Sequence, residues 1–276
     1  MMKEFFIPNT VTEFSNDNPF VLIAGPCQVE SKEHAIQMCG SLLEISMLYN
    51  IPLVYKSSFD KANRTSFNSE RGLGLEKSLQ VFEEIQNQFK VPVITDVHEP
   101  GQCDEVASVV NMLQIPAFLC RQTDLLQAAA KTDKPVMIKK GQFMAPWDMK
   151  NVIEKISHIN DKILLCERGT SFGYNRLVVD MTSLPIMKET KYPIIFDATH
   201  SVQQPGGMGA TSGGNREFAP VLARCAMTIG IAGIFMEVHQ DPDNAPSDGP
   251  NMLKLENLQD LLKQLYDIDE STKGGF

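Results

Sequence analysis

Eight short apolar runs, each rich in β-forming residues, recur along the chain and constrain its fold more than any other feature. The runs are Phe20–Gly25, Leu53–Ser58, Val91–Asp96, Met112–Ala117, Val136–Lys140, Ile163–Arg168, Ile194–Thr199 and Ile234–His239. Runs that are apolar at nearly every position are typical of parallel strands that are buried on both faces.

Helix signals mark most of the stretches between these runs, where Ser31 is a candidate helix cap. Helical spacing or high helix propensity marks residues 31–47, Leu75–Phe89, Asp104–Val110, Leu125–Ala130, Met149–Ile159, Phe218–Ile229 and Leu255–Tyr266. Strands that alternate with helices predict a (β/α)₈ barrel, for which about 250 residues is the usual size. A doubly wound sheet is the alternative, but no Gly-x-Gly-x-x-Gly motif follows an early strand.

No linker or low-complexity tract divides the 276 residues. We therefore expect one barrel domain over residues 1–276, with residues 1–17 as an N-terminal extension. Within that extension, Phe5–Ile7 and Val11–Phe14 flank Pro8-Asn9-Thr10. This pattern indicates a β-hairpin, which we expect to plug the bottom of the barrel.

Composition and charge exclude several classes of protein. The apolar share of 43% and the charged share of 21% are ordinary for a globular protein and exclude a disordered chain or a fibre. A net charge of −9 argues against general binding to nucleic acid or to an anionic membrane. The longest uncharged apolar stretch, Met227–Met236, is too short to span a bilayer. With no signal-peptide pattern and no closely spaced cysteine pair, the chain is expected to be cytoplasmic with free thiols.

Cationic residues stand at or near the predicted strand ends, where the active site of such a barrel lies. They are Lys56, Lys61, Arg64, Arg121, Lys139 and Arg168. Lys56 and Lys139 lie within otherwise apolar strands, where an ammonium group needs an anionic partner. Cations at the mouth of an acidic protein indicate substrates with phosphate or carboxylate groups. Solvated surface charge is the alternative for each single residue.

Four potential metal ligands become neighbours when the barrel closes, because the eighth strand then lies between the first and the seventh. They are Cys27, His200, Glu237 and Asp248. A thiolate, an imidazole and two carboxylates suit Zn²⁺, Fe²⁺ or Mn²⁺. The alternative is a packed cysteine beside a histidine that is hydrogen-bonded to an acid. A glycine-rich segment, residues 206–214, is expected to cradle phosphate or to form a lid or subunit contact.

Several motifs together resemble the 3-deoxy-D-manno-octulosonate 8-phosphate synthases, over about residues 20–269. The motifs are Ala24–Cys27, Lys56–Ser66, Thr95–Pro100, Pro116–Leu119, Arg121–Leu125, Cys166–Gly169, Phe172–Tyr174 and Ser247–Pro250. A related synthase of the shikimate pathway shares the Gly-Pro-Cys start and the barrel, but typically has Lys-Pro-Arg-Thr where this chain has Lys61-Ala62-Asn63-Arg64. Asn63 therefore favours the eight-carbon enzyme.

The resemblance implies a transferase that condenses phosphoenolpyruvate with D-arabinose 5-phosphate and water. The products are the octulosonate 8-phosphate, used for lipopolysaccharide synthesis, and inorganic phosphate. Members of this family are (β/α)₈ barrels and commonly homotetramers. Metal-independent members carry Asn at the position of Cys27, so Cys27 with Ser247-Asp248-Gly249 resembles the metal-dependent branch. A synthase that uses erythrose 4-phosphate and a non-catalytic anion-binding barrel are the alternatives.

The resemblance also implies roles for individual residues. Lys139, Arg168 and the backbone near Ala117 would hold the phosphate of phosphoenolpyruvate, and Lys56, Ser58 and Lys61 its carboxylate. Arg64 and Ser66 would bind the sugar phosphate, in their own or a neighbouring subunit's site, and Asn63, Asp96 and His98 the sugar hydroxyls. Arg121 is a further substrate-binding candidate. The candidates for catalysis are His200, Glu237, Asp248, Asp96 and Lys61.

Overall fold

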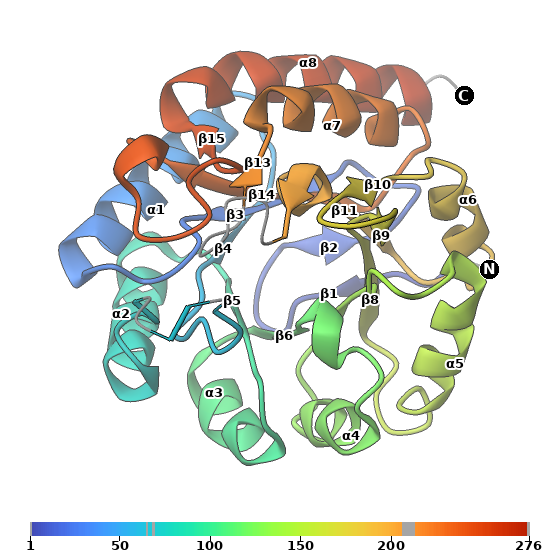
Figure 1. Ribbon diagram of the computed structural model, residues 1–276, viewed down its shortest axis with the longest axis horizontal. Helices are drawn as coiled ribbons and strands as arrows, with labels where there is room; N and C mark the ends of the chain where they lie inside the picture. Colours follow the sequence, from blue (N-terminus) through green and yellow to red (C-terminus); the bar gives the residue numbers. More distant parts are fainter. Residues whose placement is uncertain (1, 65, 68–69, 206–212, 275–276) are drawn as a thin grey trace.

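Eight parallel strands form a closed barrel, as the alternation of strands and helices predicts. The computed structural model describes residues 2–64, 66–67, 70–205 and 213–274. The strands are β3 (Val21–Gly25), β4 (Leu53–Lys56), β5 (Val93–Asp96), β6 (Met112–Ile115), β7 (Val136–Lys139), β8 (Ile163–Glu167), β11 (Ile194–Asp197) and β14 (Gly233–His239). Each pairs with the next in parallel, and β14 pairs with both β11 and β3, which closes the barrel (Figure 1).

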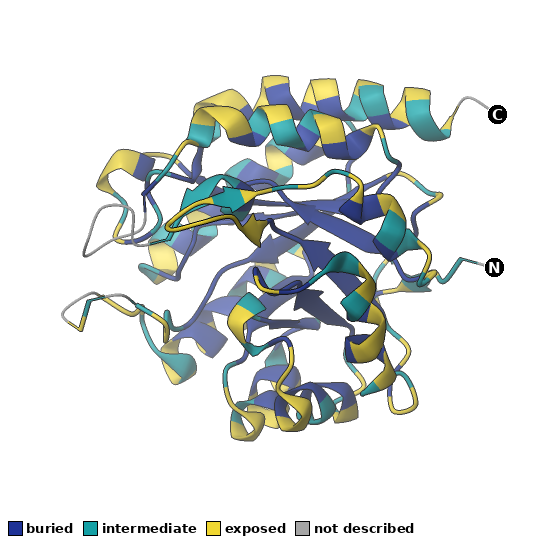
Figure 2. Ribbon diagram, turned by 45° about the vertical axis from the view of Figure 1, so that its right-hand side comes forward, coloured by how far each residue is buried: buried dark blue, intermediate teal, exposed yellow. Residues whose placement is uncertain are grey.

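A helix follows each barrel strand before the next one begins. The helices are α1 (Lys32–Met47), α2 (Leu75–Phe89), α3 (Cys103–Val109), α4 (Thr123–Lys131), α5 (Met149–Glu154), α6 (Ser183–Lys188), α7 (Ala219–Met227) and α8 (Leu258–Lys273). The predicted cap is confirmed, since the Ser31 side chain accepts a hydrogen bond from the His34 amide. Figure 2 shows the strands buried inside and the exposed helix faces outside.

Three helices depart from the sequence prediction. Helix α8, expected over Leu255–Tyr266, begins at Leu258 and continues to Lys273. The short helix α6 was not predicted, because Pro185 lies within its six residues and proline disfavours a helix interior. The helix expected over Met149–Ile159 ends at Glu154 instead. Beyond it the chain continues in tight turns, in which the Ile156 amide bonds to the Ile153 carbonyl and the Ile159 amide to that of Ile156.

The N-terminal hairpin closes the bottom of the barrel, as expected. Strands β1 (Phe5–Phe6) and β2 (Glu13–Phe14) pair antiparallel. Ile7 and Phe14 are fully buried and belong to the same apolar cluster as the inward-facing residues of the barrel strands. The hairpin therefore supplies part of the barrel's interior packing.

Five further short strands lie in the segments after β8, β11 and β14. They are β9 (Thr170–Ser171), β10 (Leu177–Val178), β12 (Gln203–Gln204), β13 (Gly213–Gly214) and β15 (Leu253–Lys254). The β12–β13 pair flanks the glycine-rich segment, of which residues 206–212 lie outside the described residues. Among the helices of the described ranges, none has the length and apolarity needed to cross a membrane.

Truncating Phe14 tests the plugging role of the hairpin. Phe14→Ala should lower the free energy of unfolding by about 3–5 kcal/mol, because it leaves a cavity at the barrel bottom. Val11→Ala in the same hairpin should change it by less than about 0.5 kcal/mol, because Val11 is 93% exposed. Denaturant titration measures both, and equal effects of the two variants would contradict the plug.

Candidate active site

A cavity of about 970 Å³ opens at the C-terminal ends of the barrel strands. Its lining includes twelve of the residues selected from the sequence: Lys56, Ser58, Lys61, Asn63, Arg64, Asp96, His98, Ala117, Lys139, Arg168, His200 and Asp248. Cys27 and Glu237 are each only 1% exposed and contact residues of this lining. Residues more than 200 positions apart in the chain thus meet at one end of the barrel.

The loop that carries Cys27 is held closely against the end of β4. A Cβ atom on Gly25 would lie 1.9 Å from the Lys56 carbonyl oxygen, so only glycine allows this approach of the two strands. The Ser57 hydroxyl donates to the Pro26 carbonyl at 3.1 Å, and the Ser58 amide donates to the Cys27 carbonyl at 3.3 Å. These contacts fix Cys27 beside the residues that follow β4.

The four proposed metal ligands converge as barrel closure predicts. Cys27 Sγ lies 3.5 Å from Asp248 Oδ2, and His200 Nε2 lies 3.7 Å from Glu237 Oε1 and 3.8 Å from Asp248 Oδ2. Ligands that surround a tetrahedral ion at about 2.1–2.3 Å are themselves about 3.5 Å apart. Both Glu237 carboxylate oxygens are buried and have no hydrogen-bond partner among the described residues. A cation at this point would satisfy them, so the donor set fits a divalent metal.

Asp197, at the end of β11, orients His200. One of its oxygens accepts a hydrogen bond from His200 Nδ1 at 2.8 Å, and the other accepts one from the His200 amide at 2.9 Å. This arrangement leaves Nε2 of His200 facing Glu237 and Asp248, as in many carboxylate–histidine–metal arrangements. Burial alone would raise the pKa of the Asp197 carboxyl, but His200 and Lys139 hold the pKa well below its ordinary value.

The role of Asp197 was missed in the sequence, although a signal was present. An acid three residues before a histidine, at the end of a predicted strand, is suitably spaced to bond the imidazole. Lys139 also bonds the Asp197 carboxylate, and its ammonium lies 3.2 Å from the centre of the Phe235 ring. The anionic partner that Lys139 was expected to need is therefore Asp197.

A second network joins the residues after β4 to those after β5. The Ser58 hydroxyl accepts from Lys56 at 2.9 Å and from Lys61 at 3.0 Å, and donates to Asp96 Oδ1 at 2.5 Å. His98 Nε2 lies 2.8 Å from the other Asp96 oxygen. Burial favours the neutral carboxyl, but Lys56 and the His98 hydrogen bond lower the pKa of Asp96 well below its ordinary value. The network therefore presents a carboxylate and two ammonium groups to one wall of the cavity.

Glu237 links this network to the proposed metal ligands. Its Oε1 lies 3.7 Å from the ammonium groups of both Lys56 and Lys61. Burial alone would raise the pKa of the Glu237 carboxyl, but His200 and the two lysines lower it to about 2. Glu237 is therefore ionised at neutral pH and is available to coordinate a cation.

Arg168 presents an unsatisfied donor at the opposite wall. Its backbone turn is fixed by Glu167 Oε1, which accepts from the amides of Arg168 at 3.1 Å and Gly169 at 2.7 Å. One guanidinium nitrogen donates to Gln203 Oε1 at 3.0 Å, whereas Nη1 is buried without a partner among the described residues. An unpaired buried guanidinium donor is costly, so an anionic group of a ligand would stabilise it.

Arg64 lies at the outer part of the cavity and does not pair with Asp60, which instead binds Arg71. Arg64 donates to Gln28 Oε1 and to the Glu70 carbonyl, each at 3.0 Å. These are uncharged acceptors, so among the described residues no carboxylate contact neutralises its positive charge.

Besides Cys27 and Glu237, two further predicted site residues, Ser66 and Arg121, do not line the described part of the cavity. Ser66 is half-buried and Arg121 is exposed, and the Arg121 carbonyl accepts a hydrogen bond from Lys155. Their roles in binding substrate remain predictions.

Comparisons with known proteins place the chain among similar sequences. Residues 8–274 match the model of the DAHP synthetase I family. A 2-dehydro-3-deoxyphosphooctonate aldolase of Bartonella quintana is 59% identical over 97% of this chain and 99% of its own length. Proteins of the same name from Rickettsia prowazekii and Brucella anthropi are 60% and 61% identical, over 99% and 95% of both chains.

Proposed function

The chain belongs to the DAHP synthetase I family, and from this premise we propose that it is a 3-deoxy-D-manno-octulosonate 8-phosphate synthase. It condenses phosphoenolpyruvate with D-arabinose 5-phosphate and water and releases inorganic phosphate. The name 2-dehydro-3-deoxyphosphooctonate aldolase, carried by relatives about 60% identical over nearly the whole chain, denotes the same activity.

The single observation that carries this function is that one cavity holds two sets of cationic side chains beside the Asp96 carboxylate. One set is Lys139 and Arg168, and the other is Lys56 and Lys61. Lys139, the unpaired Arg168 donor and the backbone near Ala117 would hold the phosphate of phosphoenolpyruvate. Lys56, Ser58 and Lys61 would hold its carboxylate. This placement leaves C2 and C3 of phosphoenolpyruvate between the Asp96 network and the proposed metal ligands.

The sugar phosphate would then bind in the outer part of the cavity. Arg64 is positively charged there and has no carboxylate partner in the part of the chain that the structure describes. Asn63 is exposed on the cavity wall. Asp96 and His98 would form hydrogen bonds with the sugar hydroxyls, because both line the cavity. Arabinose 5-phosphate bound in this way directs its aldehyde inward.

Cys27, His200, Glu237 and Asp248 would hold a divalent metal, Zn²⁺, Fe²⁺ or Mn²⁺. When bound, such an ion supplies positive charge that polarises the aldehyde oxygen and stabilises the alkoxide that forms there. The unsatisfied Glu237 oxygens and the His200 orientation set by Asp197 support this proposal.

The chain's own residues orient the reactants and move the protons. C3 of phosphoenolpyruvate attacks the aldehyde carbon, and C2 becomes cationic in character. Water then adds to C2, and the bond between C2 and the phosphate oxygen breaks to release inorganic phosphate. Asp96 is ionised and can accept a hydrogen bond from this water or from a sugar hydroxyl and so orient it, whereas its lowered pKa makes it a weak proton acceptor. Lys61 can donate a hydrogen bond to the developing negative charge. His200, Glu237 and Asp248 are the other candidates for proton transfer.

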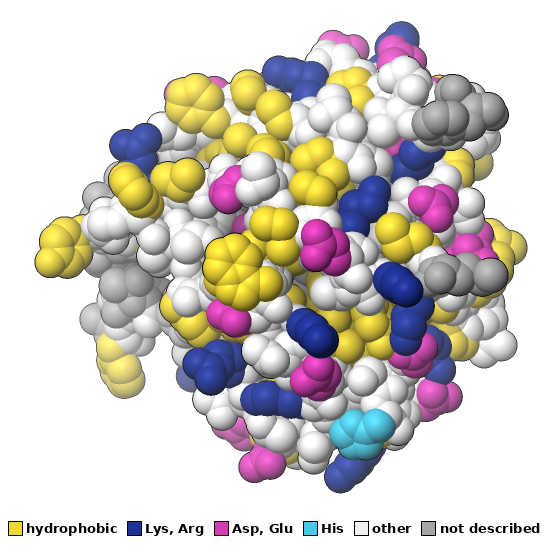
Figure 3. Space-filling view, turned by 90° about the vertical axis from the view of Figure 1, so that its right-hand side faces the viewer, with side chains coloured by type: hydrophobic (Ala, Val, Ile, Leu, Met, Phe, Trp, Pro, Cys, Tyr) yellow, Lys and Arg dark blue, Asp and Glu magenta, His cyan; other side chains and the backbone are white. Residues whose placement is uncertain are grey.

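A homotetramer is the assembly that we propose for this enzyme. Exposed aromatic side chains occur in the loops after β6, β7 and β8: Phe118, Phe143, Trp147 and Phe172. Figure 3 shows that hydrophobic side chains also reach the surface among charged ones of both signs. Apolar surface of this kind supports self-association.

Supply of lipopolysaccharide synthesis and a cytoplasmic location remain predictions.

Substrate choice tests the proposed function directly. Phosphate release should be much more efficient with arabinose 5-phosphate than with erythrose 4-phosphate, because a site that hydrogen-bonds a hydroxyl rejects an analogue that lacks it. Asn63→Ala should reduce that preference. The measurement is the ratio of kcat/KM for the two sugars. A ratio near one, or a preference for the four-carbon sugar, would favour the shikimate-type synthase. No turnover with either sugar would favour a non-catalytic barrel.

Removal of the Arg64 guanidinium tests the sugar-phosphate site. Arg64→Ala should reduce kcat/KM for arabinose 5-phosphate at least tenfold, since a charged hydrogen bond contributes about 1.5–3 kcal/mol. Arg71→Ala is the matched control, because the Arg71 side chain is exposed and does not line the described part of the cavity. An ion pair made by an exposed side chain is worth about 0–1 kcal/mol. Unchanged kinetics of Arg64→Ala at an unchanged Tm would refute this role.

Chelation tests the proposed metal. Treatment with a chelator should abolish activity, and Mn²⁺, Zn²⁺ or Cd²⁺ should restore at least part of it. Elemental analysis should find one equivalent of metal in the wild type. Cys225→Ser is the control and should also bind one equivalent, because Cys225 is exposed and does not line the described part of the cavity. Cys27→Asn should lose the metal and retain some activity. Full activity of the metal-free wild type is the result that excludes an essential metal.

A further inference from the structure

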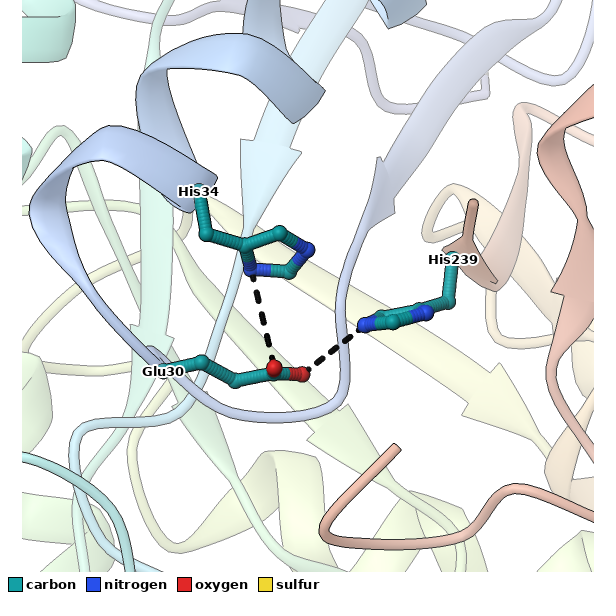
Figure 4. Close-up of side chains that lie close together, drawn as sticks. All are labelled: Glu30, His34 and His239. Carbon is teal, nitrogen blue, oxygen red and sulfur yellow. Dashed lines mark hydrogen bonds and ion pairs between the residues drawn. The ribbon is translucent and has the colours of Figure 1, made fainter. Parts of the chain in front are cut away.

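Three ionisable side chains form a cluster outside the cavity, and the mechanism does not use them. Glu30 lies in the loop between β3 and α1, His34 in the first turn of α1, and His239 at the end of β14. Figure 4 shows their side chains converging from these separate elements. Their potential ligand atoms lie within 4.8 Å of one another, so the cluster is either a second metal site or a hydrogen-bonded contact.

The hydrogen bonds of His239 decide between these two possibilities. Its Nδ1 accepts a hydrogen bond from the Asp241 amide at 2.9 Å, so the ring proton is on Nε2. That nitrogen lies 3.0 Å from Glu30 Oε1 and donates to it. A metal on Nε2 would move the proton to Nδ1, where it would face the Asp241 N–H. The arrangement therefore favours a hydrogen-bonded contact over a metal site.

His34 adds a further contact to the same segment. Its Nε2 lies 2.8 Å from Gln240 Oε1, and its ring centre lies 4.8 Å from that of His239. Its Nδ1 lies 4.0 Å from Glu30 Oε2. His239 and Gln240 are therefore held by side chains from the loop after β3 and from the start of α1, and the Asp241 amide is bonded to His239.

The position of the cluster relates it to the proposed metal ligands. Glu30 lies three residues after Cys27, and His239 lies two residues after Glu237. The register between β3 and β14 ends at the pair Gly25 and Glu237. Beyond that pair the backbones no longer form a ladder, and the Glu30–His239 hydrogen bond joins the two segments. The chain then continues through Asp241 toward Asp248.

We propose that Glu30 is a positioning residue for the metal site. Its carboxylate accepts the hydrogen bond of His239 and so fixes the segments that carry Cys27, Glu237 and Asp248 relative to one another. This inference rests on the proposed metal function. Contacts made directly to a metal ligand typically change metal affinity by about 10- to 100-fold when they are removed. The Glu30–His239 contact lies one step further out, so we expect a loss of up to about tenfold.

Three variants separate positioning from a general charge effect. Glu30→Ala removes the acceptor, whereas Glu30→Gln keeps an oxygen that can accept from His239 Nε2. Glu33→Ala is the matched control, because exposed Glu33 also places a negative charge near the start of α1. Glu30→Ser, which is too short to reach His239, replaces Glu30→Ala if that variant does not fold.

The first measurement is the affinity for Co²⁺ or Zn²⁺, determined by competition with a chelator of known affinity. Glu30→Ala should bind more weakly than the wild type, by up to about tenfold, and Glu30→Gln and Glu33→Ala should bind as the wild type does. Equal affinity of Glu30→Ala and wild type would overturn the proposal. A second metal equivalent in the wild type that is lost in Glu30→Ala would also overturn it, in favour of a metal site at the cluster.

The second measurement does not depend on the metal. Hydrogen exchange in the metal-free protein should be faster for the peptide containing Asp241 in Glu30→Ala than in the wild type, and unchanged in Glu30→Gln. If the wild type binds no metal, the proposed metal function is refuted. The exchange result then still shows whether Glu30 holds the segment that contains Asp241. Exchange that is equal in Glu30→Ala and wild type would refute the contact itself.

Discussion

The pairing of β14 with both β3 and β11 is the constraint on which the rest of the site depends. It places the end of β14 between two strands that are far from each other in the chain. Cys27, Glu237 and His200 meet only because of this closure. The same closure brings residue 239 to the start of α1, so the ligand-bearing segments are joined outside the cavity as well as within it.

Buried charges at the cavity are compensated in pairs rather than left to solvent. Lys139 pairs with Asp197, and Lys56 lies near both Asp96 and Glu237. Isolated burial of any of these groups would be strongly unfavourable. The exceptions are informative, since Glu237 and Arg168 keep buried atoms without partners among the described residues. Those atoms are where a cation and an anionic substrate group would be stabilised.

Much of the fold follows from the sequence because its signals are local. The eight apolar runs each coincide with a barrel strand to within two residues, and the helix predicted over Leu75–Phe89 has the same bounds in the structure. Burial on both faces makes a parallel strand apolar at every position, so the pattern is readable without its partners. Helix α6 was missed, since a short segment with an internal proline carries no such signal.

The sequence by itself determined which chemical groups stand at the strand ends, and through the Lys56–Ser66 motif it indicated the family. Only the tertiary structure decided which group each of them contacts. It assigned Asp197 to His200 and Lys139, paired Asp60 with Arg71 rather than Arg64, and joined Glu30 to His239. The physical reason is that hydrophobic periodicity is a property of neighbouring residues, whereas the partner of a charged side chain depends on how distant segments meet when the barrel closes.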